Sequence, residues 1–423
     1  MKGVIYYNKK MISKNDIDNY NNIEEFISSN KIYNTTNDRS YKLGFEIFGV
    51  FLIGFCKWIH ENITKEKINN IFFLARDGYI VKEVYDKLYP NENTKYLYIS
   101  RKSLVLPSIK SYNTNEIIDS LILPPSFKID DILSLLNIDI DKVKSKINKY
   151  DLNKIYYRKK LNEYNDIKKL IDDLKDIIIK NIKEQEDYFT KYLKDEEFKD
   201  KVAIIDIGWH NSIQNYFIKI NDKFKLNTRI FGYYVGVYDN AKKVKEPHKA
   251  KGYLYEYYKD NDLQYKTFSF VSLLESMFLK NEGTTLSYKK INNQIKPVID
   301  SNNIENKIIE SFQKGAIDFV DYFINKKIDI NIINKNIAMN NLIEFGLNPK
   351  KEDIKLFGNM IFENFSYNSL INFNKSNLYY YTHLKQAKLD FYKSGWRIVF
   401  LKKLIPIKFP HFLIFKILCK MFL

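Results

Sequence analysis

Residues 71–101, IFFLARDGYIVKEVYDKLYPNENTKYLYISR, decide the fold of this chain. An apolar run from Ile71 to Ala75 stops at Arg76-Asp77-Gly78, and a segment with helical spacing follows from Tyr79 to Leu88. After a break rich in proline and asparagine, a second apolar run ends at Ser100-Arg101. This order predicts a β-α-β unit, in which the residues just beyond the strand ends face the ligand crevice.

A similar pattern occurs far downstream, in KVAIIDIGWHNSIQ at residues 201–214. There the apolar run ends at Asp206, and a helix is expected to follow from about residue 211. Because the carboxyl ends of parallel strands meet at one edge of a sheet, we expect the two strand ends to lie side by side. They would then form one site from Arg76, Asp77, Ser100, Arg101 and Asp206.

The composition fits a folded protein with an anionic partner. The chain has 423 residues, of which 45% are hydrophobic, and a formal net charge of +17. This charge predicts binding to a phosphorylated substrate, an anionic lipid surface or nucleic acid. Nucleic acid is the least favoured of the three, because the basic residues are spread along the chain and form no known nucleic-acid-binding signature.

The cysteines and the apolar segments indicate the cellular compartment of the protein. The two cysteines, Cys56 and Cys419, lie far apart in apolar stretches, which predicts no disulfide scaffold and a reducing cytoplasm. The longest apolar run, Leu43 to Cys56, is shorter than the roughly 20 residues that span a bilayer, and Glu46 interrupts it. We therefore interpret this run as a buried core helix.

Changes in composition divide the chain into six parts. We predict an α/β protein with a Rossmann-like parallel sheet, a helical insertion and an α-helical C-terminal region. The parts are a lead-in (1–40), a first part of the core (41–111), a helical cap insertion (112–200), a second part of the core (201–290), an α-helical domain (291–395) and a basic amphipathic tail (396–423).

Two of these parts leave alternatives open. The insertion is predicted to cover the site, or to be a helical domain with no part in substrate binding. The tail holds Arg397, five lysines and no acidic residue, together with many large apolar side chains. Such a tail binds an anionic membrane surface, as a peripheral protein does, or docks on the domain with its lysines outward.

Asp77 and Asp206 are the main candidates for chemistry. Two carboxylates at neighbouring strand ends are suited to hold Mg²⁺, which prefers oxygen ligands and bridges to substrate phosphate. Arg76 and Arg101 would bind phosphate oxygens through their guanidinium groups, and Ser100 would add a hydroxyl donor. The alternatives are that Asp77 caps the following helix and that Asp206 only fixes a turn.

Further candidates follow Asp206 in sequence. His210 is a candidate general base, and Ser212 and Gln214 are candidate anion ligands at the start of a helix. The simpler interpretation is an exposed turn residue followed by an ordinary helix start. Glu275 lies in the apolar helix pattern VSLLESMFL, where it either faces the site or pairs with an arginine.

The motifs FFLARDGYIVKEVY, YLYISR and VAIIDIGWHNSIQ resemble a bacterial family of predicted haloacid dehalogenase-like (HAD) hydrolases found among polysaccharide biosynthesis proteins. The resemblance covers about residues 43–288. It implies a Rossmann-like core, Mg²⁺ and phosphoryl chemistry on a phosphorylated sugar or nucleotide-sugar. It also places Ser100 at the phosphate-binding position of the second motif and Asp206 at that of a later metal ligand.

The chain departs from the first motif of that superfamily, Asp-x-Asp-Gly-Thr. Asp77-Gly78 matches the second aspartate and the glycine, but the nucleophilic aspartate falls on Ala75 and the threonine on Tyr79. An aspartyl-phosphate cannot form on an alanine. The hypotheses are therefore a hydrolase or phosphotransferase with another mechanism, an inactive HAD-like binding module at the membrane surface, or a glycosyltransferase that uses the same crevice.

Overall fold

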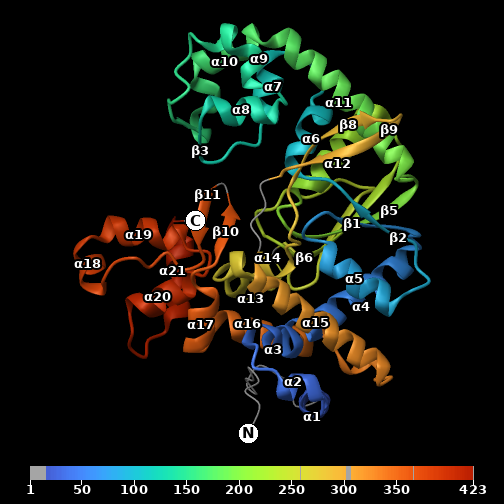
Figure 1. The fold of residues 1–423 in the computed structure, drawn as a ribbon, viewed down its shortest axis with the longest axis vertical. Helices are drawn as coiled ribbons and strands as arrows, with labels where there is room; N and C mark the ends of the chain where they lie inside the picture. Colours follow the sequence, from blue (N-terminus) through green and yellow to red (C-terminus); the bar gives the residue numbers. More distant parts are fainter. Residues whose placement is uncertain (1–15, 258, 302–305, 365, 423) are drawn as a thin grey trace.

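The computed structural model describes residues 16–257, 259–301, 306–364 and 366–422 (Figure 1). Residues 1–15 of the predicted lead-in lie outside this range. A five-stranded sheet in the order β2-β1-β5-β6-β7 forms the centre, and each neighbouring pair runs parallel. The predicted α/β fold with a parallel sheet is therefore confirmed. The strands are β1 (Asn70–Leu74), β2 (Thr94–Leu97), β5 (Lys201–Trp209), β6 (Arg229–Val237) and β7 (Lys249–Gly252).

Both faces of the sheet are buried, which explains the uninterrupted apolar runs in its strands. In β1, Ile71 and Phe73 belong to one core, while Phe72 and Leu74 belong to the other. The first core is covered by α4 (Gly49–Glu66), α5 (Tyr79–Leu88), α14 (Val271–Phe278), α15 (Lys307–Asn325) and α16 (Lys335–Leu347). The second is covered by α6 (Arg101–Ser108), α11 (Lys175–Asp195), α12 (Ser212–Phe224) and the hairpin of β8 (Thr285–Ile291) and β9 (Gln294–Ile299).

The helix that runs through the first core is longer than its sequence suggested. A continuous helical segment, Arg39–Glu66, is long and apolar enough to pass for a membrane span, but 83% of its most apolar window is buried inside the protein. Glu46 lies in the π-helical part, Gly44–Phe48, and accepts a hydrogen bond of 2.6 Å from the Tyr33 hydroxyl. The predicted role as a core helix agrees with this burial. Its first turns are α3 (Arg39–Leu43), and two shorter helices precede it, α1 (Ile17–Ser28) and α2 (Lys31–Thr35).

The insertion between β2 and β5 has a hydrophobic core of its own, and it forms a separate lobe above the sheet (Figure 1). Helices α6 and α11 contribute side chains both to this core and to the second core of the sheet. Ile178 and Ile182 of α11 lie in the insertion core, whereas Phe189 and Tyr192 of the same helix pack on the sheet. The insertion also contains α7 (Thr114–Ser120), β3 (Ser126–Phe127), α8 (Ile129–Leu135), α9 (Ile140–Ile147), β4 (Tyr156–Tyr157), η4 (Arg158–Glu163) and α10 (Asn165–Asp173).

The C-terminal third differs from its prediction. Residues 291–395 include three strands, β9, β10 (Ile361–Asn364) and β11 (Ser366–Ser369), and helices α15 and α16 share the core of the sheet. The first part of the predicted tail is also core, because Trp396 is fully buried and donates a 2.7 Å hydrogen bond to the Gly346 carbonyl. The remaining elements are α13 (Asn261–Phe268), η5 (Ile330–Ile332), α17 (Lys351–Phe357), α18 (Asn377–Thr382), α19 (Leu384–Lys393), α20 (Arg397–Leu404) and α21 (His411–Phe422).

Candidate functional site

The carboxyl ends of β1 and β5 lie side by side, since Phe73 of β1 pairs with Ile205 of β5. Numbered along the chain, the five strands are in the order 2-1-3-4-5. In a doubly wound sheet of this order, ligands bind at the carboxyl ends of the first and third strands. This is the topological switch point, where the helices that follow the two strands pack on opposite faces of the sheet. Here α5 belongs to the first core and α12 to the second. Asp77 lies three residues beyond the end of β1. The prediction that the second strand ends at Asp206 is wrong, because β5 continues to Trp209 and Asp206 pairs with Tyr234 of β6 inside it.

The turn after β1 is tight, and it fixes Asp77. The Gly78 amide donates to the Leu74 carbonyl at 2.8 Å, and a Cβ at position 78 would lie 2.6 Å from that oxygen. Only glycine therefore allows this approach. Gly78 is also the N-cap of α5, without a side-chain cap hydrogen bond. The alternative in which the Asp77 carboxylate caps α5 is therefore wrong.

The end of β5 has an unusual backbone. Gly208, Trp209 and Asn211 have φ values of 99°, 70° and 55°, in the left-handed region. A Cβ at Gly208 would lie 2.5 Å from the Cβ of Tyr234. Each non-glycine residue in this region costs about 1–3 kcal/mol, and such residues cluster at functional sites. Only Ile207 separates Asp206 from this strained segment.

A cavity of about 820 Å³ opens over the two strand ends. Asp77, Asp206 and Glu275 of α14 line it on the sheet side. The insertion contributes a second wall through residues such as Asp131 and Leu135 of α8. The cavity therefore lies between the sheet and the insertion. Its volume matches that of sites for small molecules.

Three carboxyl groups interact in this cavity. Burial raises the pKa of Asp77, and the positive charges of Arg76 and Arg101 oppose this rise. Burial also raises the pKa of Asp206, and the negative charge of Asp77 raises it further. Burial, followed by the charge of Asp77, raises the pKa of Glu275 to about 7, although Trp209 Nε1 donates to this carboxylate at 2.9 Å. Ionisation of all three carboxyl groups together is therefore unfavourable.

Arginines supply the balancing charge. Arg101, the first residue of α6, lowers the pKa of Asp206 and Glu275 as well as that of Asp77. Arg397 of α20 also acts on Glu275, and its guanidinium lies 4.8 Å from the centre of the Phe268 ring. Arg76 donates from Nη1 to Thr284 Oγ1, which ties the β1 turn to the segment before β8.

His210 is exposed in the turn just beyond β5, as the simpler interpretation predicted, and it also lines the cavity. Partial burial, followed by the positive charge of Arg101, lowers the pKa of His210 below its usual value of about 6.5. Its ring meets the edge of Tyr238, with centroids 5.1 Å apart. The imidazole is therefore neutral near pH 7, the form in which a histidine accepts a proton.

The other predicted ligands have different positions. Ser212 lines the cavity at the start of α12. Ser100 reaches the cavity wall, but its hydroxyl accepts from the Ser103 amide at 3.2 Å and donates to the Thr285 carbonyl at 2.5 Å. Its clear role is therefore to cap α6 and to join it to β8.

Gln214 lies outside the cavity, and the prediction that it binds an anion is wrong. Its side chain is fully buried. Its Nε2 donates to the carbonyls of Ile230 at 3.1 Å and Lys249 at 2.8 Å, while its Oε1 accepts from the Tyr234 hydroxyl at 3.0 Å. A buried amide with these partners holds α12 against β6 and β7, and both of its N–H donors are used, so none is left for an anion.

Sequence reasoning left Arg397 out of the site and did not decide on Glu275. Arg397 was assigned to the tail, yet it lines the cavity from α20. The signal that would have found it is the scarcity of arginine: the chain has six arginines among 68 basic residues. Among the described residues, Arg76, Arg101 and Arg397 all line this one cavity. A lysine-rich chain thus places half of its arginines where bidentate donors are useful.

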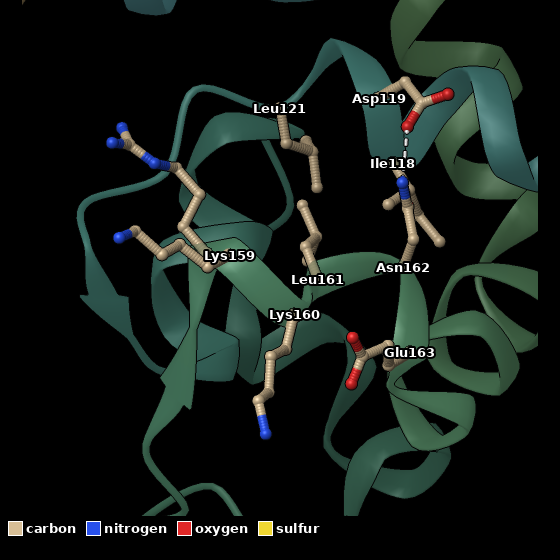
Figure 2. A pocket seen from close by; sticks show the side chains of 9 residues that line it. Ile118, Asp119, Leu121, Lys159, Lys160, Leu161, Asn162 and Glu163 are labelled. Atoms are coloured by element: carbon tan, nitrogen blue, oxygen red, sulfur yellow. Dashed lines mark hydrogen bonds between the residues drawn. The ribbon is translucent and has the colours of Figure 1, made fainter.

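A second hollow, of about 270 Å³, lies inside the insertion (Figure 2). Asn162 Nδ2 donates to Asp119 Oδ1 across it at 3.0 Å, while the chains of Lys159 and Lys160 extend away. None of the predicted site residues lines it. This hollow is therefore not the candidate site.

Glu275→Gln is expected to stabilise the fold at neutral and higher pH. Because the folded pKa of Glu275 is raised from 4.5 to about 7, the folded state binds more protons than the unfolded state between these values. Wild-type stability therefore falls as pH rises through this window. Glutamine keeps the acceptor for Trp209 but carries no charge, so the variant should gain up to about 3 kcal/mol above pH 7 and almost nothing near pH 4.5.

Urea unfolding of both forms at several pH values, in the presence of a chelator, measures this difference. A stability difference that does not grow with pH would contradict the raised pKa of Glu275. Glu256, a partly buried glutamate that pairs with exposed Lys259 at 3.2 Å, provides a control. Glu256→Gln should unfold at nearly the same urea concentration as the wild type in the same series.

No protein-family model matches this chain, and a search of curated proteins gave no significant match.

Proposed function

We propose that the chain is a HAD-like enzyme of phosphoryl chemistry, acting on a phosphorylated or nucleotide-activated sugar. One observation carries the proposal: Asp77, just beyond β1, and Asp206, in the last part of the neighbouring strand β5, line the same cavity, and the charge of Asp77 raises the pKa of Asp206. The nearby arginines suit a substrate phosphate, because a planar guanidinium can donate two parallel hydrogen bonds to its oxygens. A role in surface polysaccharide biosynthesis is proposed from the resemblance of the motifs alone.

The donor set fits Mg²⁺. Asp77 and Asp206 are half-buried, and the charge of Asp77 disfavours ionisation of Asp206, which a cation between them would relieve. Among the described residues, no group of three or more His, Cys, Asp or Glu side chains is arranged to hold a metal. Mg²⁺ usually takes one or two protein carboxylates, with water and substrate phosphate completing its shell. Asp77 and Asp206 would hold it, and it would neutralise charge on the transferred phosphoryl group.

The residues of the chain then have distinct roles. Arg101 and Arg76 bind and orient the phosphate, with Arg76 held by Thr284. Ala75 excludes a covalent intermediate at its position, so transfer goes directly to water or to an acceptor hydroxyl. In hydrolysis the water oxygen bonds to phosphorus, its proton passes to neutral His210, and the bond from phosphorus to the sugar oxygen breaks. The sugar oxygen leaves with a proton from solvent.

A second candidate is a binding module without turnover, and the alanine at position 75 favours it. In that case the same arginines and carboxylates bind a sugar phosphate, and the insertion encloses it. The two candidates make the same prediction for binding and opposite predictions for product formation.

A panel of sugar phosphates and nucleotide-sugars, with Mg²⁺ and with a chelator, tests the proposal. The expected result is Mg²⁺-dependent release of phosphate, or of a nucleotide, from at least one compound. Binding by calorimetry without any product would select the binding module. Neither binding nor product across the panel would overturn both candidates.

A further inference from the structure

The exposed apolar side chains gather on one part of the molecule. Of the 14 large hydrophobic residues that are exposed among the described residues, eight lie between positions 378 and 417. They are on α18, α19, α21 and the loop before α21, and helices α18 to α21 lie together on the side of the molecule away from the sheet (Figure 1). Six of them define what we call the basic apolar face: Leu378, Leu384, Ile407, Phe409, Leu413 and Ile417.

Hydrogen bonds join the segments that form this face. The Tyr381 hydroxyl of α18 donates to the Leu404 carbonyl at 2.6 Å, and Asn377 Nδ2 donates to the Lys403 carbonyl at 2.7 Å. His411 Nε2 and the Ile405 carbonyl are 2.7 Å apart, which closes the loop between α20 and α21. The loop that carries Ile407 and Phe409 is therefore held beside α18.

The charge around the face is almost entirely positive. Residues 376–422 contain nine lysines and arginines and one acidic residue, Asp390. Asp390 is buried, with 7% of its surface exposed, and it accepts a hydrogen bond from the Tyr380 hydroxyl at 3.0 Å. The charge visible from outside is that of exposed lysines, among them Lys403, Lys408 and Lys420. Asp262 of α13 lies nearby and is paired with Lys416 at 2.9 Å.

We propose that the basic apolar face docks on an anionic lipid membrane. Apolar side chains flanked by lysines are what an interfacial element requires, because the apolar groups enter the headgroup region while the lysines contact acidic lipids. A second copy of the chain is a poorer occupant, since two faces of the same positive charge repel one another. The exposed leucine and isoleucine side chains offer nucleic acid neither a charge for its phosphates nor an aromatic ring for its bases.

The docking surface differs from the one that the sequence predicted. The sequence pointed to residues 396–423, but Trp396, Val399 and Phe400 are fully buried core residues. The face instead combines α18 and the start of α19 with the loop and helix that follow α20. The inference does not depend on the proposed catalytic chemistry, and its test needs no substrate.

Vesicle co-sedimentation of the full chain tests this inference. One set of vesicles contains phosphatidylcholine alone, and the other contains phosphatidylcholine with phosphatidylglycerol. The wild type should sediment with the anionic vesicles, less so as salt is raised, and weakly with the neutral ones. The triple variant Lys403→Gln, Lys408→Gln, Lys420→Gln should lower the partition coefficient by about 100-fold, at about fivefold for each lysine.

A second variant tests the apolar part. Leu413→Ser with Ile417→Ser removes two exposed side chains and should leave the folded state intact, yet it should lower binding about 10- to 100-fold. The matched controls are Ile32→Ser with Ile155→Ser, both also exposed, and Lys142→Gln with Lys144→Gln and Lys146→Gln on α9. The controls should bind as the wild type does.

Three results would overturn the proposal. The first is a wild type that sediments with neither set of vesicles. The second is equal loss of binding in the controls and in the face variants. The third is a self-associating chain, detected by analytical ultracentrifugation, whose dimer is lost in Leu413→Ser/Ile417→Ser while vesicle binding is absent, which would assign the face to a second copy.

Discussion

Asp77→Asn and Asp206→Asn are each expected to lower Mg²⁺-dependent kcat by about 10³-fold or more, because each removes one carboxylate that would hold the cation at the phosphoryl group. The free energy of unfolding should not fall along with the activity. Burial raises the pKa of both carboxyls, so their ionised forms are costly, and a neutral amide of the same shape removes that cost. Stability at about pH 8 should therefore be equal or higher in both variants, by the linkage of charge to folding.

Steady-state kinetics over a range of Mg²⁺ concentrations, together with urea unfolding, measure both effects. Asp141→Asn is a suitable control, because Asp141 is an exposed acid on α9 of the insertion. It should keep full activity. Full activity in either Asp77→Asn or Asp206→Asn would refute the metal role, and a large loss of stability in both would mean that the carboxylates are structural.

Arg101→Gln is expected to lower kcat/KM by about 10²- to 10³-fold, because it removes a charged donor from the phosphate. It should also change the pH dependence. Arg101 lowers the pKa of Asp77, Asp206 and Glu275, as well as that of His210. Without its charge these pKa values rise, so the acid limb of the pH–rate profile should move to higher pH.

A merely structural arginine would not produce that shift. Lys110→Gln is the matched control, because Lys110 is an exposed cation just beyond the other end of α6. It should change neither kcat/KM nor the pH profile. An Arg101→Gln enzyme with lower activity and an unmoved acid limb would show that Arg101 acts on the substrate alone and does not set the charge of the carboxyls.

The core of this architecture was predictable, because its signals are local. Unbroken apolar runs at residues 71–74 and 202–205 indicate strands buried on both faces, and the polar residues after each run mark one edge of the sheet. The pairing of β1 with β5, and with it the approach of Asp77 to Asp206, follows from the general behaviour of parallel strands.

The site predictions that failed concern residues whose partners lie far away in the sequence. The sequence around Gln214 does not show that its amide will bind the Tyr234 hydroxyl and the Lys249 carbonyl. The sequence around Ser100 likewise does not show that its hydroxyl will donate to the Thr285 carbonyl. Arg397 enters the cavity only because α20 packs into the core through Trp396. The short strands β10 and β11 pair only with one another, so their few residues give a weak sequence signal.

Helix α11 has a consequence for how the molecule unfolds. Because its first half belongs to the insertion and its second half to the sheet, neither lobe keeps a complete core when the other melts. Excising residues 112–200 would strip Phe189 and Tyr192 from β1 and β5 along with the lobe itself. The two lobes are thus one cooperative unit, and heating should give a single transition for both, with no surviving half.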